Sequence, residues 1–457
     1  MTFTWSHAKA ERTRQWIGIL GIALLALGIG PSSAAIGLGY ALLIVFMLAS
    51  WRELASLWNM AWEIKALVLL TLYVLTQGLL TGWARPELAF DSGDLQHMLR
   101  TVALGTVAVG WAVYATRLSP RLICVLALVG FAVATAEAFL EHGPALLEIN
   151  RLHYLRSPNE VGLFGGTVAL GAFFFGGSYV VSAWRAQRHL PSAGVGTITV
   201  ALLMAGMWVW IQSGSRSAWL GLLAAIVVAA AVAIASALVA RRHVVPVCLG
   251  LTIGAVVVVA SVMHSYEDIT PRIEQDLPSL RALTSEDRQT LSLGLERGYN
   301  PRFTIWAVAV EDIKPSPLIG MGAGYVTAGF ERIEEQERLR EGLGHYHNLY
   351  LHLAVFIGVP AVLVWLATLT SLTVRTFRMG ASRQGRDSGL AWFLMAWVVF
   401  FAVTSIFQVR MHSAYGAAYF AVFSGVLLGT YLRWRVADAE QPAEASPEIR
   451  AARRDHR

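Results

Sequence analysis

Long runs of apolar residues recur along the whole chain, and they limit what it can fold into more than any other feature. A helix of about 20 apolar residues crosses the hydrocarbon core of a bilayer, and about twelve such runs occur in the 457 residues. Hydrophobic residues make up 56% of the chain and charged residues only 14%, whereas soluble domains carry about 25% charged residues. The sequence therefore predicts an all-α polytopic membrane protein and excludes a soluble enzyme, a secreted domain and a disordered scaffold.

The apolar runs divide the chain into four regions. We expect nine membrane helices in residues 1–263, a long extramembrane segment in residues 264–346, three more helices in residues 347–432, and a disordered tail in residues 433–457. The basic start of the chain has no small-residue cleavage site before Pro31, which predicts a retained anchor rather than a signal peptide. The expected spans are Gln15–Gly30, Ala34–Ser50, Ile64–Gly82, Met98–Ala115, Leu122–Leu140, Asn159–Ala183, Val195–Gln212, Ser217–Ala240, Val244–Met263, His347–Val374, Ser388–Gln408 and Ser413–Leu432.

The basic residues indicate how these spans are oriented. If the spans alternate in direction, every short loop on the side of the N-terminus is basic, which is the pattern of cytoplasmic loops. Both termini are then cytoplasmic, and the long segment 264–346 lies outside. The net charge of +6 is therefore explained by orientation, and we expect no nucleic-acid partner. Cys124 and Cys248 both lie in apolar runs, so neither a disulfide framework nor a cysteine metal cluster is expected.

The long outside segment has the composition of a folded region. Residues Arg302 to Ile313 carry Phe303, Trp306 and Val310 at helical spacing, which predicts an amphipathic helix. Prolines 315 and 317 stop it. A second, mostly charged helix is expected from Phe330 to Glu341, with a solvated surface.

The clearest charged residue close to the membrane is Arg216, in the sequence Ser213-Gly214-Ser215-Arg216-Ser217 between two apolar runs. By the orientation above, this turn faces outside. A charged residue within a membrane helix is costly, so a bound anion is one explanation for Arg216. The other is an arginine that extends its side chain to the interface.

Two more arginines face the same side. Arg302 stands at the start of the predicted helix, where backbone N–H groups favour phosphate; alternatively it pairs with Glu296 or Glu311. Arg156 precedes the sixth span and either widens the anion site or anchors the interface. Because a guanidinium offers bidentate hydrogen bonds and stays charged, two arginines at one outside pocket suit a diphosphate.

Histidines follow where the long segment re-enters the membrane. The sequence there is Gly344-His345-Tyr346-His347-Asn348, and Asn348 is predicted to cap the next helix. A histidine beside a helix N-terminus and near arginines should have a lowered pKa and accept a proton at pH 7, as a general base must. Alternatively, each histidine is a hydrogen-bonded interfacial residue. We expect His352, on another helix face, to be structural.

Weaker signals have simpler explanations. The glycines from Gly320 to Gly324 are predicted to form tight turns rather than a phosphate cradle, because they do not fit a P-loop. The sequence Asp91-Ser92-Gly93-Asp94 offers carboxylates for a divalent cation, but the signal is thin. Glu137 is the clearest acidic residue within a span, which is too little for a proton relay.

Taken in order, four motifs resemble those of the O-antigen ligase superfamily. They are Gly-Ser-Arg-Ser-x-x-Leu from Gly214 to Leu220, Pro301-Arg302-x-x-x-Trp306, the glycine turn from Pro317 to Gly324, and His345-x-His347-Asn348. The resemblance implies a C-type glycosyltransferase fold in a Gram-negative inner membrane, active at the periplasmic face. It also implies a glycan donor on undecaprenyl diphosphate, with no nucleotide, metal or other cofactor.

Within this family, the position of the long segment between helices nine and ten favours a ligase. The donor would then be undecaprenyl-diphosphate-linked O-antigen, and the acceptor would be lipid A-core oligosaccharide. Arg216 and Arg302, with Arg156 beside them, would bind the diphosphate, and His347 would deprotonate the acceptor hydroxyl, with His345 as the alternative base. An O-antigen polymerase or a protein O-oligosaccharyltransferase would share these residues. A lipid or solute transporter would favour broken helices in paired repeats, and we find no such repeat.

Overall fold

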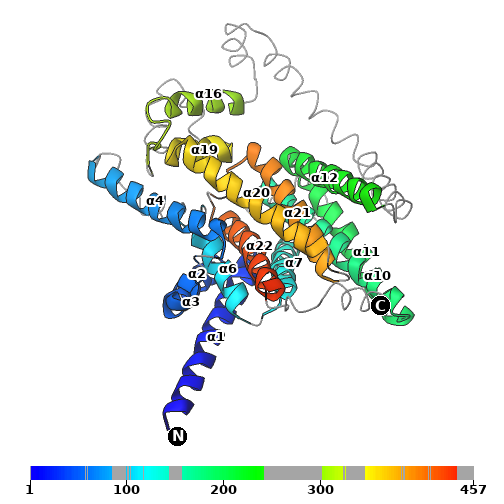
Figure 1. The fold of residues 1–457 in the computed structure, drawn as a ribbon. Helices are drawn as coiled ribbons and strands as arrows, with labels where there is room; N and C mark the ends of the chain where they lie inside the picture. The colour runs from blue at the N-terminus through cyan, green and yellow to red at the C-terminus, as the bar shows by residue number, and fades with distance from the viewer. Residues whose placement is uncertain are drawn as a thin grey trace.

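The computed structural model describes residues 2–84 (without 57 and 59), 99, 102, 104–116, 118–143, 157–240, 301–322, 325, 345–381, 383, 386–409, 411 and 413–439. The described chain is helical and contains no strand (Figure 1). Its elements are α1 (Thr2–Gly28), α2 (Ser33–Ala49), α3 (Trp51–Ser56), α4 (Trp62–Ala84), α6 (Leu104–Ala115), α7 (Pro120–His142), α9 (Pro158–Gly171), the π-helix η3 (Ala172–Gly176), α10 (Gly177–Arg185), α11 (His189–Gln212), α12 (Arg216–Ala240), α16 (Pro301–Ile313), α19 (Leu349–Ile357), α20 (Val359–Ala381), α21 (Arg386–Ile406) and α22 (Ala414–Ala439).

Eight helices of the described chain are long and apolar enough to cross a membrane. One of them continues without a break through α9, η3 and α10, from Pro158 to Arg185. Two more apolar helices, α2 and α6, are shorter. The expected class, a polytopic helical membrane protein, is therefore confirmed. The count of twelve remains a prediction, and its ninth span, Val244–Met263, lies outside the described residues.

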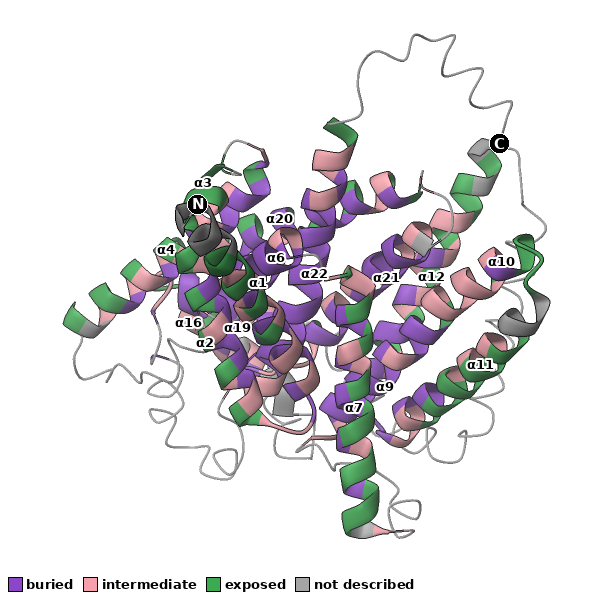
Figure 2. Ribbon diagram, turned by 90° about the horizontal axis from the view of Figure 1, so that it is seen from below, coloured by how far each residue is buried: buried purple, intermediate pink, exposed green. Residues whose placement is uncertain are grey.

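Helix α22 lies at the centre of the bundle, where Figure 2 shows it almost entirely buried. It packs closely on α6, and small residues allow that approach. A side chain added at Gly425 would meet Val109 at 2.4 Å, and one added at Gly429 would meet Val113 at 2.5 Å. Glycine pairs four residues apart bring membrane helices together in this way, because van der Waals contact must replace the hydrophobic effect within lipid.

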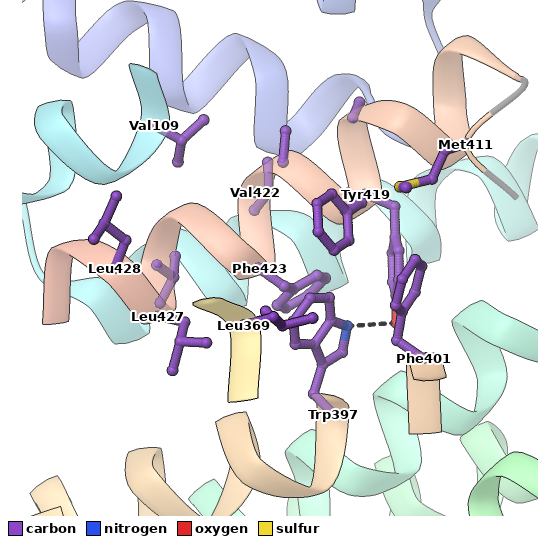
Figure 3. Close-up of a cluster of buried hydrophobic side chains, with 14 of the residues drawn as sticks. Val109, Leu369, Trp397, Phe401, Met411, Tyr419, Val422, Phe423, Leu427 and Leu428 are labelled. Atoms are coloured by element: carbon purple, nitrogen blue, oxygen red, sulfur yellow. Dashed lines mark hydrogen bonds between the residues drawn. The ribbon is translucent and has the colours of Figure 1, made fainter. Parts of the chain in front are cut away.

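A cluster of aromatic side chains joins α22 to α21 (Figure 3). The few polar atoms in this cluster form hydrogen bonds with one another. The Trp397 indole N–H donates to the Tyr419 hydroxyl at 2.7 Å, and the Thr167 hydroxyl on α9 lies 2.7 Å from the same oxygen. The Trp397 and Phe423 rings have centroids 5.4 Å apart. Because a buried polar group without a partner costs free energy, this small network fixes how the three helices meet.

The expected span His347–Val374 is wrong as a single helix. The chain forms α19 up to Ile357, turns at Gly358, and begins α20 at Val359. Gly358 has a φ of +80°, in the left-handed region, and a side chain there would meet the Leu318 carbonyl oxygen at 2.4 Å. The break between α19 and α20 therefore requires a glycine. It also brings Gly358 against Leu318, a contact that the periodicity of the sequence does not predict.

The end of α22 also differs from the expectation. The sequence predicts a tail that begins at residue 433, but the helix continues to Ala439. The Arg383 guanidinium lies 5.3 Å from the centroid of the Trp434 ring and bonds to Asp438. These contacts stabilise the last turns of α22. The polar composition of this segment does not predict them.

Candidate active site at the end of helix α21

The described parts of three sequence motifs meet around the C-terminal end of α21. A side chain added at Gly221, near the start of α12, would lie 2.5 Å from the Thr404 methyl group. On α16, the Trp306 ring lies 6.0 Å from that of Phe407. From α19, the Tyr350 hydroxyl donates to the Ala402 carbonyl at 2.7 Å. In Figure 1, α16 and α19 lie side by side at this end of the bundle. The fold therefore brings together segments that are far apart in sequence.

We call residues Ser213–Ser217, which join α11 to α12, the serine turn. Gly214 has a φ of +59°, which glycine adopts without a steric cost. The Ser213 hydroxyl donates to the Trp210 carbonyl at 2.7 Å and accepts from the Ser215 backbone N–H at 3.2 Å. The hydroxyl oxygens of Ser215 and Ser217 are 3.1 Å apart. All three serines are buried, so their hydroxyls hold the turn itself.

The serine turn is also bonded to α9. The Ser215 hydroxyl donates to the Asn159 side-chain carbonyl at 2.7 Å. A side chain added at Gly162 would meet the Ser213 hydroxyl at 2.6 Å, so the two segments are in direct contact. Arg216, the first residue of α12, is half-buried beside these groups. The structure thus places the Arg216 backbone in a rigid, hydrogen-bonded turn.

The start of α9 is bonded in turn to the start of α22. Ser157 caps α9 by accepting from the Glu160 backbone N–H at 3.3 Å. The buried Glu160 carboxylate accepts from the Ser413 hydroxyl at 2.7 Å, and Ser413 accepts from the Gly416 N–H at 2.9 Å. Sequence reasoning missed Glu160. The sequence does contain a signal for it: Glu160 is the third residue of α9 and follows the cap residue Ser157, which is the spacing of a capping box.

We call residues His345–Asn348 the histidine loop. The two histidine rings are 4.2 Å apart and both are half-buried. His347 has a φ of +52°, the left-handed region that residues with a side chain avoid. Asn348 accepts from the backbone N–H groups of Tyr350 and Leu351 at 3.0 and 3.1 Å, which confirms the predicted helix cap. Capping by Asn348 does not require a strained backbone at the preceding residue, so the strain at His347 needs another reason.

Tyr346 fastens the histidine loop to α16. Its hydroxyl donates to the Asp312 carboxylate at 2.5 Å, and Tyr325 donates to the other carboxylate oxygen at 3.3 Å. Burial, together with the hydrogen bond to Asp312, raises the pKa of Tyr346 above its ordinary value. The hydroxyl therefore stays protonated and able to donate. Neither Tyr346 nor Asp312 was among the expected site residues, because only the folded chain brings them together.

Helix α16 forms where predicted, from Pro301 to Ile313. Its buried side differs from the expectation: Ile305 and Ala309 are buried, whereas Val310 is 46% exposed. The helix packs on α19. Arg302 lies in the first turn of α16.

The glycine turn after α16 serves the fold. The backbone N–H groups of Met321 and Gly322 donate to the carbonyls of Val355 and Phe356 at 2.6 and 3.0 Å. These carbonyls end α19, where a helix leaves its last acceptors unpaired. The two N–H groups are thus engaged with the helix, which confirms a tight turn at residues 320–322 and leaves neither of them to cradle a phosphate. Residues 323 and 324 of the predicted turn lie outside the described residues. His352 is buried 4.7 Å from the Phe356 ring, as a structural residue would be.

The remaining candidates divide into two groups. Arg156 and the sequence Asp91–Asp94 lie outside the described residues. Glu137 is exposed on α7 and lines a cavity of about 190 Å³ with Glu141 and Glu160. Among the residues that the structure describes, no group of three or more His, Cys, Asp and Glu is placed to hold a metal ion.

The fold and this site define a multi-pass helical membrane protein with arginine, serine and histidine motifs gathered at one end of its bundle. The model of the O-antigen ligase family matches residues 199–366. That range contains the serine turn, α16 and the histidine loop. The chain thus carries a domain of the O-antigen ligase family, whose members are glycosyltransferase-like enzymes, and the resemblance found in the sequence is confirmed. Comparison with curated proteins gives no match.

Proposed function

We propose that this protein is an O-antigen ligase. It transfers O-antigen polysaccharide from undecaprenyl diphosphate to a sugar hydroxyl of lipid A-core, at the periplasmic face of the inner membrane and with both termini cytoplasmic. The observation that carries the proposal is the meeting of the serine turn, α16 and the histidine loop at the end of α21. One end of the bundle then holds both cationic residues and candidate bases, as transfer between two membrane-held substrates requires.

The donor diphosphate binds to Arg216 and Arg302, with Arg156 beside them. Arg216 begins α12 and Arg302 lies in the first turn of α16, and a helix start favours a bound anion. Negative charge grows on the diphosphate as it leaves the sugar. Fixed cations stabilise this charge most in the transition state and thereby speed the reaction.

His347 is the general base. It takes the proton from the acceptor hydroxyl as that oxygen attacks the anomeric carbon on the face opposite the diphosphate. The new glycosidic bond forms while the bond from the anomeric carbon to the diphosphate oxygen breaks, and the electron pair leaves on undecaprenyl diphosphate. The configuration is inverted, and the mechanism needs neither metal nor ATP. The neighbouring ring of His345, 4.2 Å away, is the alternative base.

The test is transfer by the purified protein in liposomes, with undecaprenyl-diphosphate-linked O-antigen and lipid A-core, in EDTA and without ATP. We expect the lipid A-core band to shift on a gel, and the shift to disappear with R216Q. Arg188, exposed at the opposite end of α11, provides the matched control, and R188Q should transfer normally.

Other outcomes would identify other functions. If donor chains lengthen without the acceptor, the protein is an O-antigen polymerase. If glycan appears only on an added protein acceptor, it is a protein O-oligosaccharyltransferase. If the donor crosses the bilayer and no new bond forms, it is a transporter. Any of these results would overturn the ligase assignment.

A further inference from the structure

A second charged cavity lies at the other end of the bundle. It has a volume of about 540 Å³ and is lined by residues of α1, α3, α6 and α22, among them Glu11, Arg14, Glu53, Trp111, Tyr114 and Arg433. Along α22, 20 residues separate Ser413, beside the candidate active site, from Arg433 in this cavity. At about 1.5 Å per helical residue, the two places are roughly 30 Å apart. We call the cavity that Arg433 lines the inner cavity.

One part of the inner cavity is negative. The Arg14 guanidinium bonds to two carboxylates, Glu11 on its own helix at 2.6 Å and Glu53 on α3. Two negative charges thus surround one positive charge. The Glu11 and Glu53 side chains are 47% and 51% exposed, so both carboxylates are accessible to another cation. The second Glu11 oxygen also accepts from the Gln15 side-chain amide at 3.3 Å.

Another part of the inner cavity is positive. The half-buried Arg433 guanidinium donates to the Thr116 carbonyl oxygen. Among the residues that the structure describes, no carboxylate lies within ion-pair distance of it. A guanidinium carries five N–H donors, and one carbonyl leaves most of them available. The cavity as a whole therefore has balanced charge, with separate negative and positive parts.

The surroundings of the inner cavity have the character of a membrane interface. Trp51, beside Glu53 on α3, is 60% exposed, and Trp62 at the start of α4 is 41% exposed. The cations of Arg52 and Lys65 lie 5.7 and 5.9 Å from the ring centroids of Trp51 and Trp58. Exposed tryptophans and basic residues collect at the level of lipid headgroups. These surroundings therefore favour a lipid headgroup as the occupant of the inner cavity.

We infer that the inner cavity binds the headgroup of a zwitterionic phospholipid, with its phosphate on Arg433 and its ammonium on Glu11 and Glu53. Separate positive and negative groups match a headgroup that carries both charges, whereas an anionic headgroup would meet two carboxylates. The site takes a lipid that is not a substrate, on the end of the bundle away from the proposed reaction. It does not depend on the proposed function.

Native mass spectrometry of the full-length protein tests this inference. The protein in detergent is equilibrated with phosphatidylethanolamine, phosphatidylglycerol or diacylglycerol, each with the same acyl chains. We expect phosphatidylethanolamine to be retained best and diacylglycerol least. In R433Q, retention of phosphatidylethanolamine should fall on the order of tenfold, because one charge-assisted hydrogen bond is lost. R435Q is the matched control, since Arg435 on the same helix bonds to Tyr431 and should keep normal retention.

A second variant tests the negative part without disturbing Arg433. E53Q should reduce the preference for phosphatidylethanolamine over phosphatidylglycerol. Equal retention of diacylglycerol, equal effects of R433Q and R435Q, or an unchanged preference in E53Q would each overturn the inference. So would displacement of the lipid by inorganic phosphate, which would identify a free-anion site. A melting temperature for each variant shows whether it folds. If R433Q does not fold, the lipid preference of E53Q tests the inference.

Discussion

The serine turn and the histidine loop stand at the same end of the bundle, but they are held in different ways. The serine turn is fixed by short-range hydrogen bonds between the buried Ser213 hydroxyl and the backbone and by one bond from Ser215 to Asn159. The histidine loop is fixed by the cap at Asn348 and by a bond from Tyr346 to Asp312 on another helix. The turn is part of the bundle core, whereas the loop takes its shape from α16.

This difference separates two tasks that the proposed reaction needs. An arginine that binds a diphosphate works best when its backbone does not move, because preorganised charge requires no rearrangement. A base must approach the acceptor, and the backbone at His347 is held in an unfavourable conformation. Such strain persists only where the surrounding structure imposes it, and Tyr346 and Asn348 on either side provide that restraint.

The largest expected effect is that of H347G. Transfer should fall by about 10²–10⁴-fold with loss of a general base. The melting temperature should not fall, because glycine adopts a φ of +52° freely and relieves about 1–2 kcal/mol of backbone strain. The rate of the lipid A-core shift and a thermal unfolding curve measure the two effects. H345G is the comparison, and near-normal transfer in H347G with a loss in H345G would move the base to His345.

R216Q should have the next largest effect. Transfer should fall by about 10²–10³-fold, as when a preorganised group that stabilises the transition state is removed. The backbone bonds of the serine turn do not involve the guanidinium, so the melting temperature should change little. Transfer assays at saturating donor separate this loss from weaker donor binding. A normal rate in R216Q would remove the serine turn from the mechanism.

S215A and Y346F compare the two regions directly. S215A removes the buried hydroxyl that donates to the Asn159 side chain at 2.7 Å, and loss of this buried partner should cost about 1–3 kcal/mol of stability. Y346F removes the bond to Asp312, which keeps a second donor in Tyr325, so it should cost less stability and more activity. Melting temperatures and transfer rates measured side by side give the result. If S215A loses more activity than Y346F, transfer depends more on the bonds of the serine turn than on those of the histidine loop.

The smallest effect is a pH dependence. The pKa of Tyr346 is raised by burial and by Asp312, so the folded protein favours its protonated form. Its contribution to stability is complete below about pH 10, the ordinary tyrosine pKa, and is lost as the pH rises toward the raised value. The difference in melting temperature between the wild-type protein and Y346F should therefore shrink above about pH 10. A difference that stays constant from neutral to alkaline pH would show that the Tyr346 hydroxyl does not stabilise the loop.

Features that depend on neighbouring residues could be predicted from the amino-acid sequence. Apolar length predicted the membrane helices, Asn348 predicted a cap, and the prolines after Ile313 predicted the end of α16. The motifs around Arg216, Arg302 and His347 were sufficient to indicate the family. These signals are local, since helix formation and capping depend on residues within a few positions of one another.

The contacts between distant segments could not be predicted from the sequence and are seen in the folded chain alone. The break at Gly358, the extension of α22 to Ala439 and the bond between Tyr346 and Asp312 each join parts of the chain whose pairing no periodicity encodes. The Glu160 carboxylate likewise found its partner, Ser413, on another helix. Within a bundle, a buried polar group must bond to whatever lies beside it, and what lies beside it is set by the packing of helices rather than by the order of residues.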